Sequence, residues 1–158
     1  MIADHVKTLA ERCISQSKMV ACVESCSGGM LAAVCTDLAG SSAWFERGWV
    51  TYSNAAKMDC VGVTAATLET YGAVSEATAR EMAVGGVVHS RAHVCVSITG
   101  VAGPSGGTAQ KPVGMVCFGI AVRGGSVQTQ TQYFAGDRVA VRTEAVAHAL
   151  KLLVEAIG

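Results

Sequence analysis

The fold is decided by one short stretch, Ala21-Cys22-Val23-Glu24-Ser25-Cys26-Ser27-Gly28-Gly29. Its apolar first half predicts a buried strand, and the glycine pair precedes a segment whose apolar residues have helical spacing. A strand therefore passes into a helix here. Such junctions gather backbone N–H groups and the positive end of the helix dipole, which suit anions and developing oxyanions. The sequence predicts a functional site at this junction.

Helical and strand patterns alternate along the rest of the chain. We expect helices over residues 1–17 and 28–38, a short one capped by Asn54, and further ones capped by Thr64, Ser75 and Asp137, with Gly72 ending the Thr64 helix. We expect strands over residues 19–24, 49–52, 94–99, 114–122 and 127–134, the last at a sheet edge after a hairpin turn. This order predicts a single α/β domain over residues 1–158, a three-layer α/β/α sandwich whose mixed sheet includes an antiparallel hairpin.

The composition narrows the class of protein. Hydrophobic residues make up 51% and charged residues 15%, and the formal net charge is zero. Overall attraction to nucleic acid or anionic membranes is therefore missing, and the low charge fraction favours a homodimer or larger homo-oligomer. The N-terminal helix lacks the apolar core of a signal peptide, and no run approaches the ~18 apolar residues of a membrane span. We expect a cytoplasmic protein with neither nucleic acid nor membrane as partner.

The seven cysteines are odd in number and scattered. That pattern is typical of reduced core residues, so we expect no disulfide scaffold. Cys22 and Cys26 lack metal-ligand spacing and have no nearby histidine, which argues against a zinc site. We expect neither a metal nor a cofactor.

The serine at the junction needs a base, because a hydroxyl is otherwise a weak nucleophile. The histidines lie on helices away from the glycine-rich segments. Lys57 follows the second strand near Tyr52, and a neutral lysine can act as the base. A serine–lysine pair of Ser25 and Lys57 is one interpretation, although Lys57 taken alone is more typical of a solvated helix residue. For Ser27, a role as the cap of the following helix explains the hydroxyl as well as a functional role does.

A second glycine-rich stretch, residues 100–107, follows the third expected strand. Its N–H groups could face a phosphate or oxyanion, or the stretch could be a plain surface turn. Ser41 and Thr99 add hydroxyl groups at chain breaks. Lys111 and Arg142 are the cationic candidates for an anionic ligand, and each could also be a solvated charge.

Ordered blocks of this sequence resemble the CinA C-terminal domain family, the nicotinamide-nucleotide amidases. The blocks are residues 24–29, 40–48, 51–57, 72–75, 99–107, 111–114 and 136–138, and together they span nearly the whole chain. The family often has threonine at the position of Ser27 and glutamate at that of Ala55. The first difference keeps a hydroxyl, and the second argues against an essential carboxylate at that position.

The resemblance implies hydrolysis of the carboxamide of nicotinamide mononucleotide to nicotinic acid mononucleotide and ammonia, within pyridine nucleotide salvage. It implies that Ser25 is the nucleophile, that Lys57 is the base and that Tyr52 relays or orients the proton. The substrate-binding residues are then Ser27, Gly28, Gly29, Ser41, Asn54, Thr99, Gly100 and Arg142.

Three of these expectations concern charge. The oxyanion is expected at N–H groups near Gly28 and Gly29 or near Gly100. Arg142 is expected to bind the 5′-phosphate, and Glu24 to face the pyridinium ring. No metal is required.

Several alternatives stay open. We expect the stand-alone amidase form, without the larger domain associated with ADP-ribose hydrolysis that some family members carry. Cys26 is a lower-ranked nucleophile. A non-catalytic nucleotide-binding or regulatory module, linked to competence or DNA damage, is the rival from another functional class. An amidase or esterase for another small substrate is the second.

Overall fold

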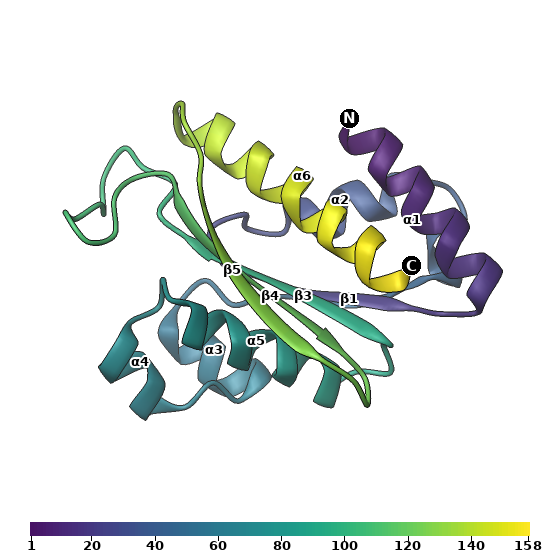
Figure 1. Ribbon diagram of the computed structural model, residues 1–158, viewed down its shortest axis with the longest axis horizontal. Coiled ribbons are helices and arrows are strands. Elements are labelled where there is room, and N and C mark those ends of the chain that lie inside the picture. Colours follow the sequence, from purple (N-terminus) through teal and green to yellow (C-terminus); the bar gives the residue numbers. More distant parts are fainter.

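A mixed five-stranded sheet runs through the computed structural model, which describes residues 1–158 (Figure 1). The strands are β1 (Val20–Glu24), β2 (Phe45–Val50), β3 (Val94–Gly100), β4 (Met115–Val122) and β5 (Val127–Tyr133), in the spatial order β2-β1-β3-β4-β5. β1 is parallel to both of its neighbours, β2 and β3, whereas β4 is antiparallel to both of its neighbours, β3 and β5. The expected mixed sheet with an antiparallel hairpin at its edge is confirmed.

Helices cover both faces of this sheet (Figure 1). α1 (Ile2–Gln16), α2 (Met30–Thr36) and α6 (Arg138–Ile157) lie on one face. α3 (Asn54–Val61), α4 (Ala65–Tyr71) and α5 (Glu76–Val88) lie on the other, and the short turn η1 (Ser41–Ala43) precedes β2. A separate hydrophobic core fills each interface between helices and sheet. The three-layer sandwich is therefore confirmed, and none of its helices has the length and apolar character needed to cross a bilayer.

α2 begins later than its apolar spacing predicts. The expected helix started at Gly28, but Gly28 and Gly29 have φ values of 60° and 99° and form a turn ahead of Met30. Positive φ is the left-handed region that glycine adopts without strain. The glycine pair thus lengthens the connection between β1 and α2, which is the segment that carries Ser25.

The second strand also differs from its prediction. β2 ends at Val50 instead of spanning residues 49–52, and it begins at Phe45. Glu46, Arg47 and Gly48 interrupt the apolar pattern that would have revealed the first half of this strand. A Cβ atom at Gly48 would lie 2.9 Å from Cys22 Sγ on β1, so close packing of the two strands favours glycine there.

Capping residues behave largely as the sequence predicts. The side chains of Thr64, Ser75 and Asp137 accept backbone N–H groups at the starts of α4, α5 and α6. The exception is α3, where Ser53 is the cap and accepts the Ala56 N–H, while Asn54 is the first helical residue. β3 is buried over six of its seven positions, as expected for a central strand covered on both faces.

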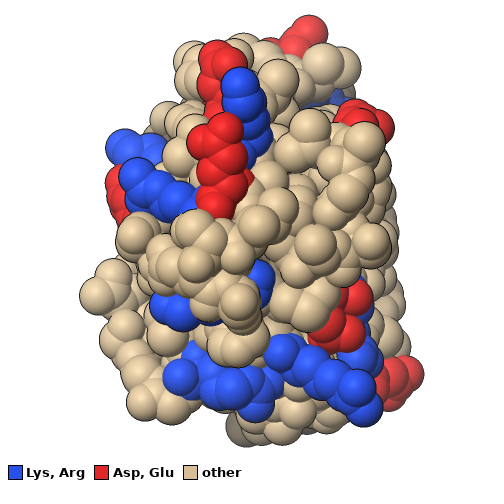
Figure 2. Space-filling view, turned by 90° about the vertical axis from the view of Figure 1, so that its right-hand side faces the viewer, with Lys and Arg blue, Asp and Glu red and all other residues tan.

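The surface carries charge of both signs. Figure 2 shows one end of the molecule, where acidic and basic side chains both occur and the basic ones gather in a band along the lower edge. Over the whole chain the formal net charge is zero.

Candidate active site

A cavity of about 350 Å³ opens where β1 and β3 end, next to the segment that follows β2. Ligand sites in α/β sheets commonly lie at the carboxyl ends of parallel strands, because the chain leaves the sheet there. Five segments far apart in the sequence converge on this cavity. Its walls are formed by Ser25, Cys26, Tyr52, Lys57, Ala73, Val74, Thr99, Gly100, Val101, Ala102, Gly103, Ser105, Gly106 and Arg138.

Ser25 is the first residue beyond β1. Its N–H donates to the Ile98 carbonyl at 2.9 Å, which extends the ladder between β1 and β3 by one bond. Its carbonyl then accepts the Gly28 N–H at 3.0 Å and closes a tight turn. The side chain is 8% exposed. The sheet and the turn together hold the Ser25 hydroxyl at the floor of the cavity.

Lys57 reaches the same floor from α3. Its side chain is fully buried, and Nζ lies 3.0 Å from Ser25 Oγ. Nζ also donates to the carbonyl oxygens of Thr51 at 2.8 Å and Tyr52 at 3.4 Å. The expected proximity of Ser25 and Lys57 is therefore confirmed.

Burial changes the protonation of Lys57. Removal of its ammonium group from water lowers the pKa of Lys57, because desolvation disfavours the charged form. No carboxylate forms a salt bridge with it. A neutral Nζ has two N–H groups and one lone pair, which match its two carbonyl acceptors and the Ser25 hydroxyl. The arrangement can therefore accept the proton of Ser25.

Tyr52 and Arg138 form the mouth of the cavity. Tyr52 is 62% exposed, and its hydroxyl lies 3.5 Å from Arg138 Nη2. No hydrogen bond joins the Tyr52 hydroxyl to Ser25 or Lys57, so the expected proton relay has no direct contact here. Arg138, at the start of α6, also donates to the Gly103 carbonyl at 2.9 Å.

Arg138 had no role in the sequence prediction. It lines both the cavity and an adjoining hollow beside the start of α6. The signal that could have found it is its place in the block at residues 136–138.

Thr99 and Gly100 line the cavity as predicted. The Thr99 hydroxyl donates to the Ala73 carbonyl at 2.8 Å and thereby fixes the segment between α4 and α5 against β3. A Cβ atom at Gly100 would lie 2.7 Å from Val116 Cγ2 and 2.8 Å from the Met115 carbonyl oxygen. Glycine is therefore required there for β3 and β4 to remain paired.

The other predicted pocket residues do not reach the cavity. Its walls do not include Ser27, Gly28, Gly29, Ser41 or Asn54. Ser27 is fully buried and donates to Glu24 Oε1 at 2.7 Å, so it caps no helix and contacts no cavity. Ser41 lies in η1, before β2, and Asn54 begins α3.

Two charged residues make contacts other than those predicted. Glu24 is 1% exposed, and its carboxylate accepts the N–H groups of Leu31 and Ala32 at 2.9 and 3.0 Å. It therefore caps the start of α2 and does not line the cavity. Arg142 donates from Nε to the Cys26 carbonyl and from Nη2 to the Ser27 carbonyl, each at 3.1 Å, and does not line the cavity.

Cys26 lines the cavity beside Ser25, but its thiol is a poor nucleophile. Burial raises the pKa of Cys26 to about 11, so the thiolate is scarce near neutral pH. No three His, Cys, Asp or Glu side chains converge in a way that could hold a metal ion.

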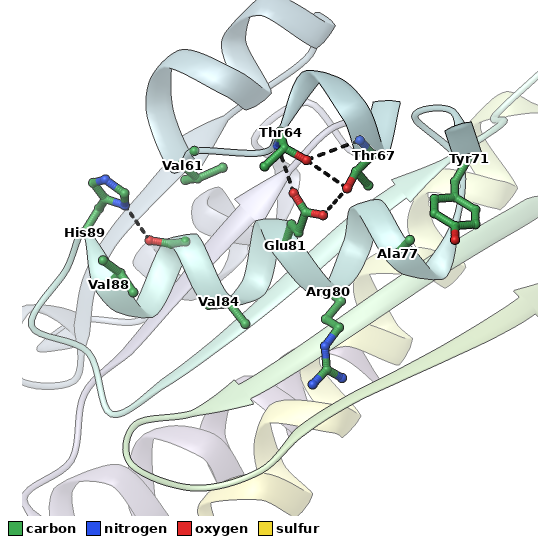
Figure 3. Close-up of a pocket in the computed structure, with 12 residues that line it drawn as sticks. Val61, Thr64, Thr67, Tyr71, Ala77, Arg80, Glu81, Val84, Val88 and His89 are labelled. Atoms are coloured by element: carbon green, nitrogen blue, oxygen red, sulfur yellow. Dashed lines mark hydrogen bonds between the residues drawn. The ribbon is translucent and has the colours of Figure 1, made fainter. Parts of the chain in front are cut away.

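A wider hollow of about 630 Å³ lies elsewhere, along α3, α4 and α5 (Figure 3). Glu81 projects into it from α5 and accepts the Thr64 N–H at 2.8 Å and the Thr67 hydroxyl. The Nδ1 atom of the His89 ring forms a hydrogen bond to the Gly85 carbonyl oxygen at 2.9 Å. In this hollow the Thr67 hydroxyl donates to a carboxylate, which is a much weaker base than the amine beside Ser25, so the smaller cavity at Ser25 is the candidate active site.

Known proteins are similar to this chain in sequence and in fold. The CinA C-terminal domain family matches residues 2–157. The nicotinamide-nucleotide amidohydrolase PncC of Enterobacter agglomerans is 56% identical over 132 residues, which cover 84% of this chain and 80% of that protein. The protein of the same name in Escherichia coli K12 is 54% identical over 134 residues, which cover 85% and 81%.

Solved structures extend the similarity to the backbone. The competence/damage inducible protein CihA of Agrobacterium tumefaciens has a TM-score of 0.95 and 42% identity, covering 99% of this chain and 94% of that one. A CinA superfamily protein of Klebsiella pneumoniae has a TM-score of 0.94 and 36% identity, covering 99% and 98%.

Proposed function

The chain belongs to the CinA C-terminal domain family, and from this premise we propose that it hydrolyses the carboxamide of nicotinamide mononucleotide to nicotinic acid mononucleotide and ammonia. The names of its relatives support the substrate and the reaction. One observation supports the mechanism most directly: the buried Lys57 Nζ lies 3.0 Å from Ser25 Oγ at the floor of a cavity. We propose Ser25 as the nucleophile and Lys57 as the general base.

In the first step, neutral Lys57 takes the Ser25 proton while Oγ forms a bond to the carboxamide carbon. The carbonyl π electrons move to oxygen, and backbone N–H groups at the cavity floor stabilise this oxyanion. The carbon–nitrogen bond then breaks. Ammonia leaves with the proton that Lys57 returns, and an ester to Ser25 remains.

In the second step, a water molecule attacks the ester. Lys57 takes the proton of that water and then gives it to Ser25 Oγ, which is released as the carboxylate product forms. The two Nζ–H groups keep their bonds to the Thr51 and Tyr52 carbonyls throughout, so the amine stays oriented while its lone pair gains and loses a proton.

We propose that Arg138, in place of Arg142, recognises the 5′-phosphate. It is the cationic residue at the mouth of the cavity, and its guanidinium is exposed there. A guanidinium can form two parallel charge-assisted hydrogen bonds with a phosphate. Tyr52, beside it, then forms one wall for the substrate.

An ammonia-release assay on nicotinamide mononucleotide tests this function. Wild-type protein should release ammonia, whereas Ser25→Ala and Lys57→Ala should not. Free nicotinamide is the matched substrate control, because it has the same carboxamide but no ribose phosphate. Activity retained in both variants would contradict the mechanism, and faster hydrolysis of free nicotinamide would contradict the substrate.

The expected homodimer or larger homo-oligomer and the expected cytoplasmic location stay predictions. Light scattering coupled to size-exclusion chromatography measures the first, and cell fractionation measures the second.

A further inference from the structure

We propose that Arg142 is a positioning residue for the oxyanion, acting through the backbone of the turn at residues 25–29 and not on the substrate. This inference rests on the proposed function. Its starting point is the pair of bonds from Arg142 to the Cys26 and Ser27 carbonyls, each at 3.1 Å. The side chain is half-buried and lies outside the cavity wall, so a direct substrate contact does not explain it.

The two carbonyls lie in consecutive peptide units of the turn. In a trans peptide, the C=O and N–H groups point in opposite directions. The Ser27 carbonyl faces Arg142, so the Gly28 N–H of the same peptide points away from it. That N–H donates to the Ser25 carbonyl at 3.0 Å. Arg142 thereby helps to fix the orientation of the peptide that joins Ser25 to Cys26.

This peptide carries the N–H that matters for the reaction. With the Ser25 carbonyl held by Gly28, the Cys26 N–H points the opposite way, and it donates to no backbone carbonyl. Cys26 also lines the cavity beside Ser25. In hydrolases whose serine sits on a strand-to-helix turn, the N–H of the next residue is an oxyanion donor. The Cys26 N–H is in that position.

Glu24 holds the same turn from the other side. Its carboxylate accepts the Ser27 hydroxyl at 2.7 Å and the first amides of α2. Ser27 therefore lies between an anionic acceptor for its side chain and a cationic donor for its carbonyl. Without Arg142, the Ser27 carbonyl keeps only the Met30 N–H, at 3.1 Å. The turn would then be held at one side only.

Arg142→Lys tests this role, because lysine keeps the charge but lacks the planar pair of donors. We expect kcat to fall about 10- to 100-fold, as for an oxyanion donor that is displaced but not lost, while KM for nicotinamide mononucleotide changes less than about threefold. A fluorophosphonate that labels Ser25 provides a second readout. Its phosphoryl oxygen occupies the oxyanion position, so the labelling rate should fall by a similar factor.

Arg12→Lys is the matched control. Arg12 also donates from a half-buried guanidinium to a backbone carbonyl, that of Val154 at 3.0 Å, but far from Ser25 in the fold. This variant should keep kcat and the labelling rate. An equal loss in both variants would assign Arg142 a merely structural role and overturn the proposal.

Other outcomes are equally decisive. A tenfold rise in KM with unchanged kcat would make Arg142 a substrate ligand and overturn the inference. If wild-type protein releases no ammonia from nicotinamide mononucleotide, the proposed function fails, but the labelling rates still test Arg142, and equal rates in Arg142→Lys and wild type overturn its role. If Arg142→Lys does not fold, Arg142→Gln is measured in the same way, because glutamine retains one donor for the turn.

Discussion

The side chains of Ser25 and Lys57 meet at 3.0 Å although 32 residues separate them in the sequence. Strand pairing brings them together. The Glu24 carbonyl at the end of β1 accepts the Thr51 N–H at 2.7 Å, and the Thr51 carbonyl accepts Lys57 Nζ at 2.8 Å. Two successive hydrogen bonds through Thr51 thus link Glu24, the residue before Ser25, to Lys57.

Because Ser25 and Lys57 act as one unit in the proposed reaction, their losses should not add. Ser25→Ala and Lys57→Met should each lower kcat at least about 1,000-fold, and the double variant should be no worse than the poorer single one. Steady-state ammonia release from nicotinamide mononucleotide measures all three. Multiplicative losses would show that the two residues act independently.

The pH dependence should report the protonation of Lys57. Its folded pKa is lowered by burial, so the neutral, basic form becomes available below the ordinary lysine pKa of about 10.4. Therefore kcat/KM should rise with pH through this lowered pKa and then level off. Cys26→Ser is the control, and this variant should show the same rise of kcat/KM with pH, the basic limb of the profile. A limb near 11 that disappears in Cys26→Ser would instead indicate the thiolate, whose pKa is raised to about 11.

Arg138→Gln should raise KM for nicotinamide mononucleotide about 10- to 100-fold, because a charge-assisted bond of roughly 1.5–3 kcal/mol is lost. With nicotinamide riboside, which lacks the phosphate, the variant and wild type should have similar kcat/KM. The comparison needs initial rates for both substrates. An equal loss with both would exclude phosphate recognition by Arg138.

Glu24→Gln should destabilise the fold by about 1–3 kcal/mol, because the new amide N–H₂ would face an N–H donor of α2 and leave a buried donor unpaired. Urea unfolding followed by circular dichroism measures the free energy of unfolding. Glu11→Gln, at an exposed position on α1, is the matched control and should stay within about 0.5 kcal/mol of wild type. A neutral Glu24→Gln would show that the buried carboxylate is dispensable for stability.

Gly85→Ala should lower stability by about 1–3 kcal/mol or more, although alanine ordinarily stabilises a helix relative to glycine. A Cβ atom at Gly85 would overlap the Val61 backbone, so α3 and α5 could not keep their spacing. Gly125→Ala, in the hairpin turn, places its Cβ no closer than 3.4 Å to Val122 and should be nearly neutral. Thermal unfolding of the two variants compares them directly.

Element types and the pairing of Ser25 with Lys57 are predictable from sequence, because each depends on local pattern or on residue blocks with a known context. The assignment of the charged residues was not. Arg138 and Arg142 lie one helical turn apart on α6, so spacing alone gives them nearly the same face. Only the packing of α6 against the turn at residues 25–29 decides which guanidinium reaches the cavity.

The position of the Glu24 side chain differs from the prediction for another reason, the alternation of side chains along a strand. Consecutive residues at a strand end point to opposite sides of the sheet, so Glu24 and Ser25 are not expected to share one cavity. The complementarity between a carboxylate and a pyridinium ring points to a ligand contact, but the alternation of side chains along the strand directs the Glu24 carboxylate to the start of α2 instead. The start of α2 was missed for a local reason, because two glycines with positive φ replaced the expected first helical turn.

The buried thiols have a practical use. Six of the seven cysteines are buried, and they occur on both faces of the sheet and in α1 and α2. Apart from Cys26, which lines the cavity, a thiol reagent can reach them only when the surrounding packing opens, so each of these five cysteines is a natural probe of local opening. The rate at which each sulfur is modified in the native state would map how the layers separate, without the introduction of a foreign label.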